Sequence, residues 1–122
     1  PKDLFKTNCD IISPCALGGV INQSNLHQLK CKAIVGAANN QLENPTIAEW
    51  LLKNKIIYSP DYLVNSGGVI AIACEINNTE NLLEKHLEKI ADRLKPVLQA
   101  SIKNNESTDF VARRIAWERI NS

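Results

Sequence analysis

The sequence contains no methionine and few residues of the kinds that bind metals or form disulfides. Its two histidines, His27 and His86, lie far apart, and its four cysteines include no C-x-x-C pair. Zinc sites and disulfide frameworks both depend on closely spaced or paired ligands. The composition therefore argues against a metal centre and against a disulfide-stapled secreted domain. The four cysteines are Cys9, Cys15, Cys31 and Cys74.

The chain also lacks an excess of charge of either sign and any long apolar run. Its 14 basic and 13 acidic residues give a net charge of +1, which offers no electrostatic footprint for nucleic acid or an anionic membrane. No segment resembles a transmembrane helix or a secretory signal. We therefore expect a cytoplasmic protein that binds neither nucleic acid nor membranes. Since the chain starts at Pro1 without a methionine, we also expect it to be a piece of a longer protein.

What the sequence does contain is an alternation of short apolar runs and helical patterns. With 122 residues, 44% of them hydrophobic, it has the size of one domain. The pattern predicts strands at 9–14, 33–35 and 56–58, a helix at 25–29 capped by Ser24, and a helix between Pro45 and Asn54. This order favours a parallel sheet. We predict an α/β fold over residues 1–122, with three short parallel strands, flanking helices and a helical C-terminal extension.

The C-terminal extension is predicted from helical spacing alone. Apolar residues between positions 83 and 98 recur on one helical face, and Pro96 is expected to kink or split that helix. A last helix is predicted from Thr108 onward. Its expected inward-facing residues are Phe110, Ile115 and Ile120, and its expected (i, i+4) ion pair is Arg114 with Glu118.

The first candidate site follows the central strand. The run 33–35 predicts a strand buried on both faces, and three small residues lead from it to Asn39 and Asn40. Ligands of open α/β sheets bind beyond the carboxyl ends of the strands, where these two amides are expected to lie. The alternative is a loop in which the asparagines only satisfy their own turn.

A second candidate site lies at 65–75. Asn65 precedes two glycines and an almost uncharged apolar run, which predicts a buried helix that starts at a crevice. Asn65 is expected to cap this helix, to bond a ligand amide, or to do both. Val69 and Ile72 share one helical face and line an apolar pocket or simply pack in the core.

Cys15 lies in a third stretch of interest, just before Gly18 and Gly19. The glycines predict a tight strand-to-helix passage whose backbone N–H groups meet a ligand, although such a pair is also common in ordinary turns. A nucleophilic role for Cys15 is the weaker interpretation, because no activating base or cation is adjacent in sequence.

Four stretches in this order carry a resemblance to a known family. They are 10–18 (DIISPCALG), 36–42 (GAANNQL), 58–62 (YSPDY) and 65–70 (NSGGVI), and the ending at 112–120 (ARRIAWERI) continues it. Together they resemble the amino-acid dehydrogenases of the glutamate/leucine/phenylalanine/valine dehydrogenase superfamily, and within it the leucine dehydrogenases. The resemblance implies the C-terminal portion of a Rossmann-type NAD-binding domain. Members oxidise an α-amino acid with NAD to a keto acid and ammonia.

The resemblance also implies roles for individual residues. Cofactor contacts are expected from Cys15, Ala16, Asn39, Asn40 and Asn65. Asn39 would bond the nicotinamide ribose or the substrate, and Asn65 the nicotinamide carboxamide, with Asn40 as a second candidate. Val69 and Ile72 match the pocket for the substrate side chain. Because aliphatic Ile72 gives a carboxylate no partner, an apolar and branched-chain amino acid is favoured over glutamate.

The family's G-x-G-x-x-G phosphate loop and its catalytic lysine and aspartate have no counterpart in this sequence. We therefore expect no catalytic residue in this chain and no turnover from it alone, the lysine and aspartate belonging to a separate N-terminal domain. A homo-oligomer is expected, as in the family. Two alternatives remain: a non-catalytic Rossmann-like binding or oligomerisation module, and a different Rossmann-type oxidoreductase.

Overall fold

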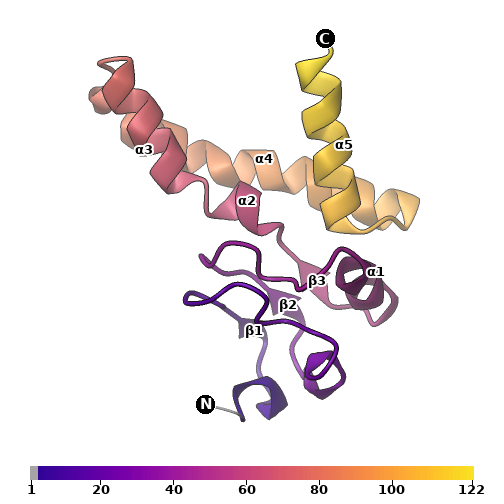
Figure 1. Cartoon of the computed structure of the whole chain (residues 1–122). Helices are drawn as coiled ribbons and strands as arrows, with labels where there is room; N and C mark the ends of the chain where they lie inside the picture. The colour runs from indigo at the N-terminus through magenta and orange to yellow at the C-terminus, as the bar shows by residue number, and fades with distance from the viewer. Residues whose placement is uncertain (1–2) are drawn as a thin grey trace.

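In the computed structural model, which describes residues 3–122, a small parallel sheet supports a layer of helices (Figure 1). The strands β1 (Ile11–Ile12), β2 (Ala33–Ile34) and β3 (Ile57–Tyr58) pair in chain order, all parallel. The α-helices are α1 (Thr46–Lys53), α2 (Asp61–Val64), α3 (Gly67–Ile76), α4 (Leu83–Asn104) and α5 (Thr108–Ile120). Short 3-10 helices lie at Leu4–Lys6, Leu26–Gln28 and Glu80–Leu82. The predicted α/β fold with a helical extension is confirmed.

The sheet is buried on only one of its faces. Side chains alternate along each strand, so the parallel register creates two rows. One row is buried and consists of Ile12, Ile34 and Tyr58, each at most 4% exposed. In the other row Ile11 is 59% and Ile57 48% exposed. On the central strand itself Ile34 is buried and Ala33 is half-buried, so the expected burial on both faces is only partly met.

The buried face of the sheet forms the larger of two cores. Ile47 and Leu51 lie one turn apart on α1, and both are fully buried against the sheet. Ile21 and Leu26 complete this core from the segment between β1 and β2. A smaller core joins α4 to α5 through Val97, Val111 and Ala112.

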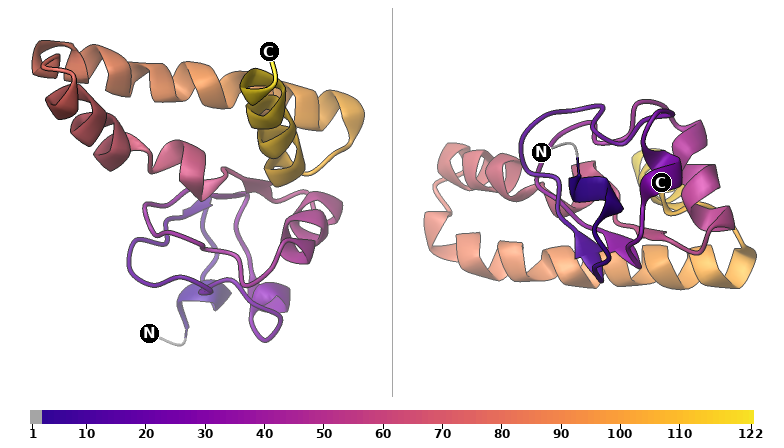
Figure 2. Two further views of the ribbon diagram at one scale, coloured as in Figure 1. Left: turned by 45° about the horizontal axis from the view of Figure 1, so that its top comes forward. Right: turned by 90° about the horizontal axis from the view of Figure 1, so that it is seen from below.

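The helices α2 to α5 form the second layer, along which α4 runs from the α3 end to the α5 end (Figure 2). Pro96 lies within α4, which continues from Leu83 to Asn104, so the proline does not split the helix. Packing against α2, α3 and α5 holds this helix in place despite its proline.

Several local expectations are wrong. Phe110 and Ile120 are 52% and 77% exposed, whereas Ile115 packs on the smaller core as predicted. Arg114 pairs with Glu106, at 2.8 Å, instead of Glu118. The segment 25–29 contains only a 3-10 helix, whose N-cap is Asn25 without a side-chain hydrogen bond. Ser24 does not cap it and donates its hydroxyl to Asn22 Oδ1.

Within residues 3–122, no helix combines the length and the apolar character that a membrane crossing needs. The same residues contain no group of three His, Cys, Asp or Glu side chains arranged to hold a metal ion.

Candidate functional site

Two of the predicted site residues, Asn39 and Asn65, meet side chain to side chain. Asn39 follows β2, and Asn65 ends the short helix α2. The Asn65 Nδ2 group donates to Asn39 Oδ1 at 2.6 Å and lies 3.4 Å from the carbonyl oxygen of Ala37. Among the described residues, no hydrogen bond engages Asn39 Nδ2 or Asn65 Oδ1. The pair therefore presents one amide donor and one amide acceptor to a ligand.

The β1 corner is held against the same loop by a close backbone approach. The N–H of Ala38 donates to the carbonyl oxygen of Pro14 at 2.9 Å. A Cβ atom on Gly36 would lie 2.2 Å from that oxygen, so only glycine fits at this position. The ends of the neighbouring parallel strands β1 and β2 thus come together.

Cys15 and Ala16 are exposed on the β1 corner. The Sγ atom of Cys15 lies 3.4 Å from Ser13 Oγ. That hydrogen bond, followed by the influence of the Ala37 backbone, lowers the pKa of the Cys15 thiol below its ordinary value. The hydrogen bond from the Ala38 N–H to the Pro14 carbonyl oxygen keeps the corner of Cys15 beside the loop that carries Asn39. Because the lowering comes from neutral groups and not from a base or cation, it does not favour the nucleophile interpretation.

The loop between β2 and α1 is fixed from inside by Gln41, which is fully buried. Its Nε2 group donates to the carbonyl oxygens of Gly36 at 2.8 Å and Ala38 at 2.9 Å. Its backbone N–H donates to Asp61 Oδ2 at 2.7 Å. Sequence reasoning assigned no role to Gln41 or Asp61, although both lie in the stretches 36–42 and 58–62 that carry the family resemblance.

Asn40 takes a different place from Asn39. Its φ angle is +51°, a left-handed conformation that asparagine tolerates, and its carbonyl oxygen accepts from the N–H of Gly19 at 2.7 Å. Asn40 lines a groove of about 270 Å³ that neither Asn39 nor Asn65 lines. The structure therefore brings Asn39 and Asn65 together and leaves Asn40 apart from them.

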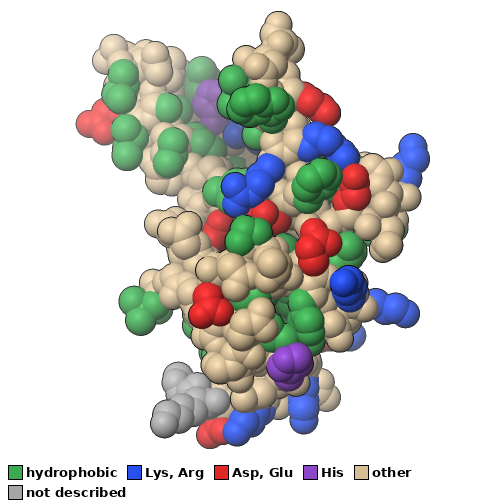
Figure 3. Space-filling model, turned by 45° about the vertical axis from the view of Figure 1, so that its right-hand side comes forward, with side chains coloured by type: hydrophobic (Ala, Val, Ile, Leu, Met, Phe, Trp, Pro, Cys, Tyr) green, Lys and Arg blue, Asp and Glu red, His purple; other side chains and the backbone are tan. Residues whose placement is uncertain are grey.

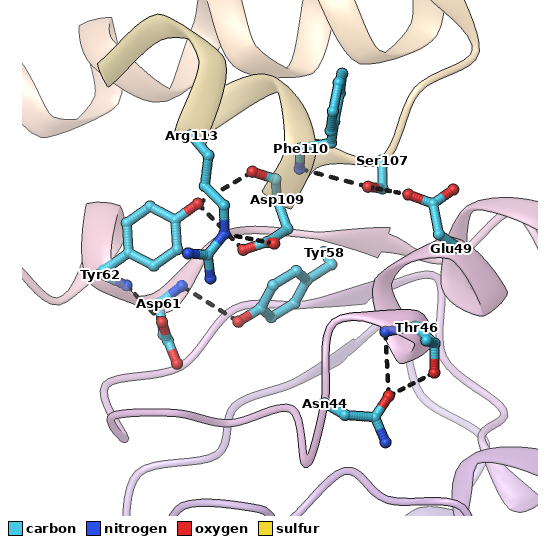
Figure 4. Close-up of polar contacts among 10 residues, drawn as sticks. All are labelled: Asn44, Thr46, Glu49, Tyr58, Asp61, Tyr62, Ser107, Asp109, Phe110 and Arg113. Carbon is cyan, nitrogen blue, oxygen red and sulfur yellow. Dashed lines mark hydrogen bonds and ion pairs between the residues drawn. The ribbon is translucent and has the colours of Figure 1, made fainter. Parts of the chain in front are cut away.

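This groove is bordered by a polar network that joins α2 to α5 (Figure 4). The Tyr62 hydroxyl donates to Asp109 Oδ1 at 3.1 Å, and Asp109 Oδ2 forms a 2.8 Å ion pair with Arg113. Burial, with the Asp109 carboxylate as the next cause, raises the pKa of Tyr62. Burial likewise raises the pKa of Tyr58, whose hydroxyl accepts from the N–H of Asp61.

Helix α3 begins two residues after Asn65 and exposes its apolar face. Val69 is 72% and Ile72 59% exposed, and of the whole helix only Cys74 is buried. The predicted burial of this helix is therefore wrong, and so is the alternative that Val69 and Ile72 pack in the core of this chain. Asn65 is not the cap of α3 either, since the helix starts after Ser66 without a side-chain cap.

Charged side chains are interspersed on the molecular surface. On the face shown in Figure 3, Lys and Arg alternate with Asp and Glu and form no single basic patch. This distribution agrees with the net charge of +1.

Comparison with known proteins shows which family the chain matches. The family model for glutamate/leucine/phenylalanine/valine dehydrogenases matches residues 1–112. A leucine dehydrogenase from Geobacillus stearothermophilus is 42% identical over 98% of the chain and 33% of the relative. A phenylalanine dehydrogenase from Thermoactinomyces intermedius is 42% identical over 96% of the chain and 32% of the relative.

A solved structure agrees. The crystal structure of L-tryptophan dehydrogenase from Nostoc punctiforme superposes with a TM-score of 0.94 at 38% identity, covering 99% of the chain and 37% of that protein. The chain spans about a third of the length of the curated relatives it matches. The chain belongs to the glutamate/leucine/phenylalanine/valine dehydrogenase family.

Proposed function

We propose that this chain is the C-terminal portion, 1–122, of the Rossmann-type NAD-binding domain of an amino-acid dehydrogenase. The whole enzyme converts an apolar, branched-chain L-amino acid to the 2-keto acid and ammonia. The observation that carries the proposal is the 2.6 Å contact between Asn65 Nδ2 and Asn39 Oδ1, at the carboxyl ends of parallel strands.

The residues at this corner fit the nicotinamide end of NAD. A nicotinamide carboxamide has one carbonyl acceptor and one NH₂ donor, which the free Nδ2 of Asn39 and the free Oδ1 of Asn65 complement. Cys15 and Ala16, exposed beside the same loop, offer a surface on which the cofactor lies. NAD, when bound, accepts the hydride from the substrate Cα. The protein groups orient that end of the cofactor and fix the face it presents.

The exposed face of α3 supports an apolar substrate. Val69 and Ile72 lie on the exposed face of α3, the helix that begins two residues after Asn65. Binding a substrate with a branched aliphatic side chain against Val69 and Ile72 is favourable, because apolar surface is removed from water. Binding glutamate there is unfavourable, because its carboxylate loses hydration without gaining a hydrogen-bond or ion-pair partner. This arrangement favours leucine or valine over glutamate.

The other parts of the site are proposed to lie elsewhere in the enzyme. A lysine and an aspartate of an N-terminal domain would handle the proton transfers, and closure of the two domains would exclude water. The open sheet face, with Ile11 and Ile57, and the exposed face of α3 are surfaces that further domains or subunits can cover. We propose a cytoplasmic homo-oligomer.

The decisive experiment is an assay of the full-length protein with NAD and leucine, valine, phenylalanine, tryptophan or glutamate, following NADH formation. We expect the highest kcat/KM with leucine or valine and the lowest with glutamate. Preference for phenylalanine or tryptophan would contradict the branched-chain assignment. If none of these amino acids is deaminated, the proposal that the full-length protein is an amino-acid dehydrogenase is wrong, and a non-catalytic binding or oligomerisation module is favoured.

A further inference from the structure

We infer that Gln41 and Asp61 are positioning residues that hold the Asn39–Asn65 pair ready for the nicotinamide end of the cofactor. The inference rests on the proposed function for the identity of the ligand. It deepens that proposal by naming two buried side chains that touch neither cofactor nor substrate and act through the asparagines.

Gln41 shapes the loop that carries Asn39. Its Nε2 group bonds the carbonyl oxygens of Gly36 and Ala38, three and one residues before Asn39, at 2.8 and 2.9 Å. Two carbonyl groups that would otherwise point into a dry interior are thereby satisfied by one side chain. The loop is held in a single shape around Asn39.

Asp61 ties this loop to the segment that carries Asn65. Asp61 is buried, with 6% of its surface exposed. Its carboxylate accepts hydrogen bonds from the backbone N–H groups of Gln41, at 2.7 Å, and Tyr62, at 2.6 Å. Its backbone carbonyl accepts from the N–H of Asn65 at 2.8 Å. The Asp61 carboxylate therefore joins the backbone of Gln41, 20 positions earlier, to the start of α2, and the helical bond between Asp61 and Asn65 ends that helix.

Burying the polar side chains of Gln41 and Asp61 lowers the free energy of unfolding relative to apolar residues, which indicates a role beyond packing. The Oε1 atom of Gln41 is buried and has no hydrogen-bond partner among the described residues. A buried carboxylate and a half-satisfied buried amide both lose hydration that an aliphatic core residue would not lose. What they provide in exchange is the fixed geometry of the loop and of Asn65.

The test uses the full-length protein with Gln41→Met, which removes both Nε2 hydrogen bonds at similar volume, and Asp61→Asn, which keeps the shape of Asp61. Binding of NADH and of ADP, which lacks the nicotinamide half, is measured by calorimetry. We expect NADH affinity to fall about tenfold while ADP affinity stays unchanged, because only the nicotinamide side loses its ordered partner. The matched control is Ser101→Ala, which removes a buried hydroxyl bonded to the carbonyl oxygen of Glu106 at 2.6 Å.

Equal loss of NADH and ADP affinity would overturn the inference, since general destabilisation weakens both. So would unchanged NADH affinity. Hydrogen exchange followed by mass spectrometry separates this inference from the proposed function. We expect faster exchange of the amides at 36–41 in both variants and not in the Ser101→Ala control. If the unaltered protein binds no NADH, the proposed function fails, and exchange alone decides whether these side chains hold the loop. Faster exchange at 36–41, joined by the Tyr62 amide in Asp61→Asn, supports this role, and unchanged exchange overturns it.

Discussion

Asn65 and Asn77 make similar side-chain hydrogen bonds, but only that of Asn65 joins two segments of the site. Asn65 Nδ2 bonds Asn39, 26 positions away, whereas Asn77 Nδ2 bonds the carbonyl oxygen of Ala73 in its own helix at 2.7 Å. We expect Asn65→Ala to weaken NADH binding by about three- to tenfold, the effect of losing a hydrogen bond to the ligand. Fluorescence titration with NADH measures this. Asn77→Ala is the control, and an equal effect of the two substitutions would contradict the assignment.

The two tyrosines of the chain give its stability a dependence on alkaline pH. In the folded state burial raises the pKa of Tyr62, and the Asp109 carboxylate adds to the shift. A tyrosine in the unfolded chain has a pKa of about 10. Above that pH the unfolded chain holds fewer protons than the folded one, so the free energy of unfolding falls as the pH rises.

Urea unfolding at about pH 9 and about pH 11 tests the tyrosine effect. We expect the fall in the free energy of unfolding to be smaller in Tyr62→Phe than in the unaltered protein, because the titrating group is gone. Ser101→Ala keeps both tyrosines and should keep the full fall. An identical fall in Tyr62→Phe would show that Tyr62 does not carry the effect.

At the scale of the elements, Pro96 is the residue least suited to its helix. It lies inside α4 on an exposed position, lacks an N–H group and crowds the carbonyl of the preceding turn. We expect Pro96→Ala to raise the free energy of unfolding by about 1–3 kcal/mol, somewhat offset by the greater freedom of the unfolded chain. Urea midpoints at constant m value measure the change, with exposed Lys95→Ala as the control. No gain would mean that the packing of α4 requires the proline.

The elements also show what sequence patterns predict well. The strands and α1 were predicted because their apolar spacing reports burial against neighbours within the chain, as for Ile47 and Leu51. The same reasoning failed for α3 and for Phe110, because an apolar run does not reveal whether its partner belongs to the described chain. Arg114 pairs with Glu106 because the turn before α5 folds back on it, which spacing along a single helix does not show.

Asn39 and Asn65, which the structure brings into contact, were singled out from the sequence, whereas Gln41 and Asp61, which bond the segments that carry them, were not. Asn39 and Asn65 follow strands or precede glycines, which are local signals. The role of Gln41 depends on Asp61, 20 residues later, so it follows only from the tertiary fold. Asn40 carries the same side chain as Asn39 but has a positive φ angle and lines another groove.

At the scale of the whole molecule, the sheet layer and the helical layer meet through polar contacts at the carboxyl ends of the strands. Besides the Asn39–Asn65 and Gln41–Asp61 bonds, Thr108 Oγ1 donates to the carbonyl oxygen of Tyr58 at 2.6 Å. The proposed nicotinamide corner is thus part of the junction between the two layers, and α3 extends away from that junction (Figure 1). The apolar residues Val69 and Ile72 of α3 are exposed.

Under the proposed function, this arrangement predicts how the full-length protein selects the charge of its substrate. Ile72 is 59% exposed on α3 and gives an acidic side chain no partner. We expect Ile72→Lys to lower kcat/KM for leucine by about tenfold or more and to raise it for glutamate, because the ammonium group pairs with the substrate carboxylate and is poorly placed beside an aliphatic chain. The control is Ile102→Lys, since Ile102 on α4 is also exposed, at 78%. Unchanged relative rates with leucine and glutamate in Ile72→Lys, or the same shift in Ile102→Lys, would show that the face of α3 beside Asn65 does not receive the substrate side chain.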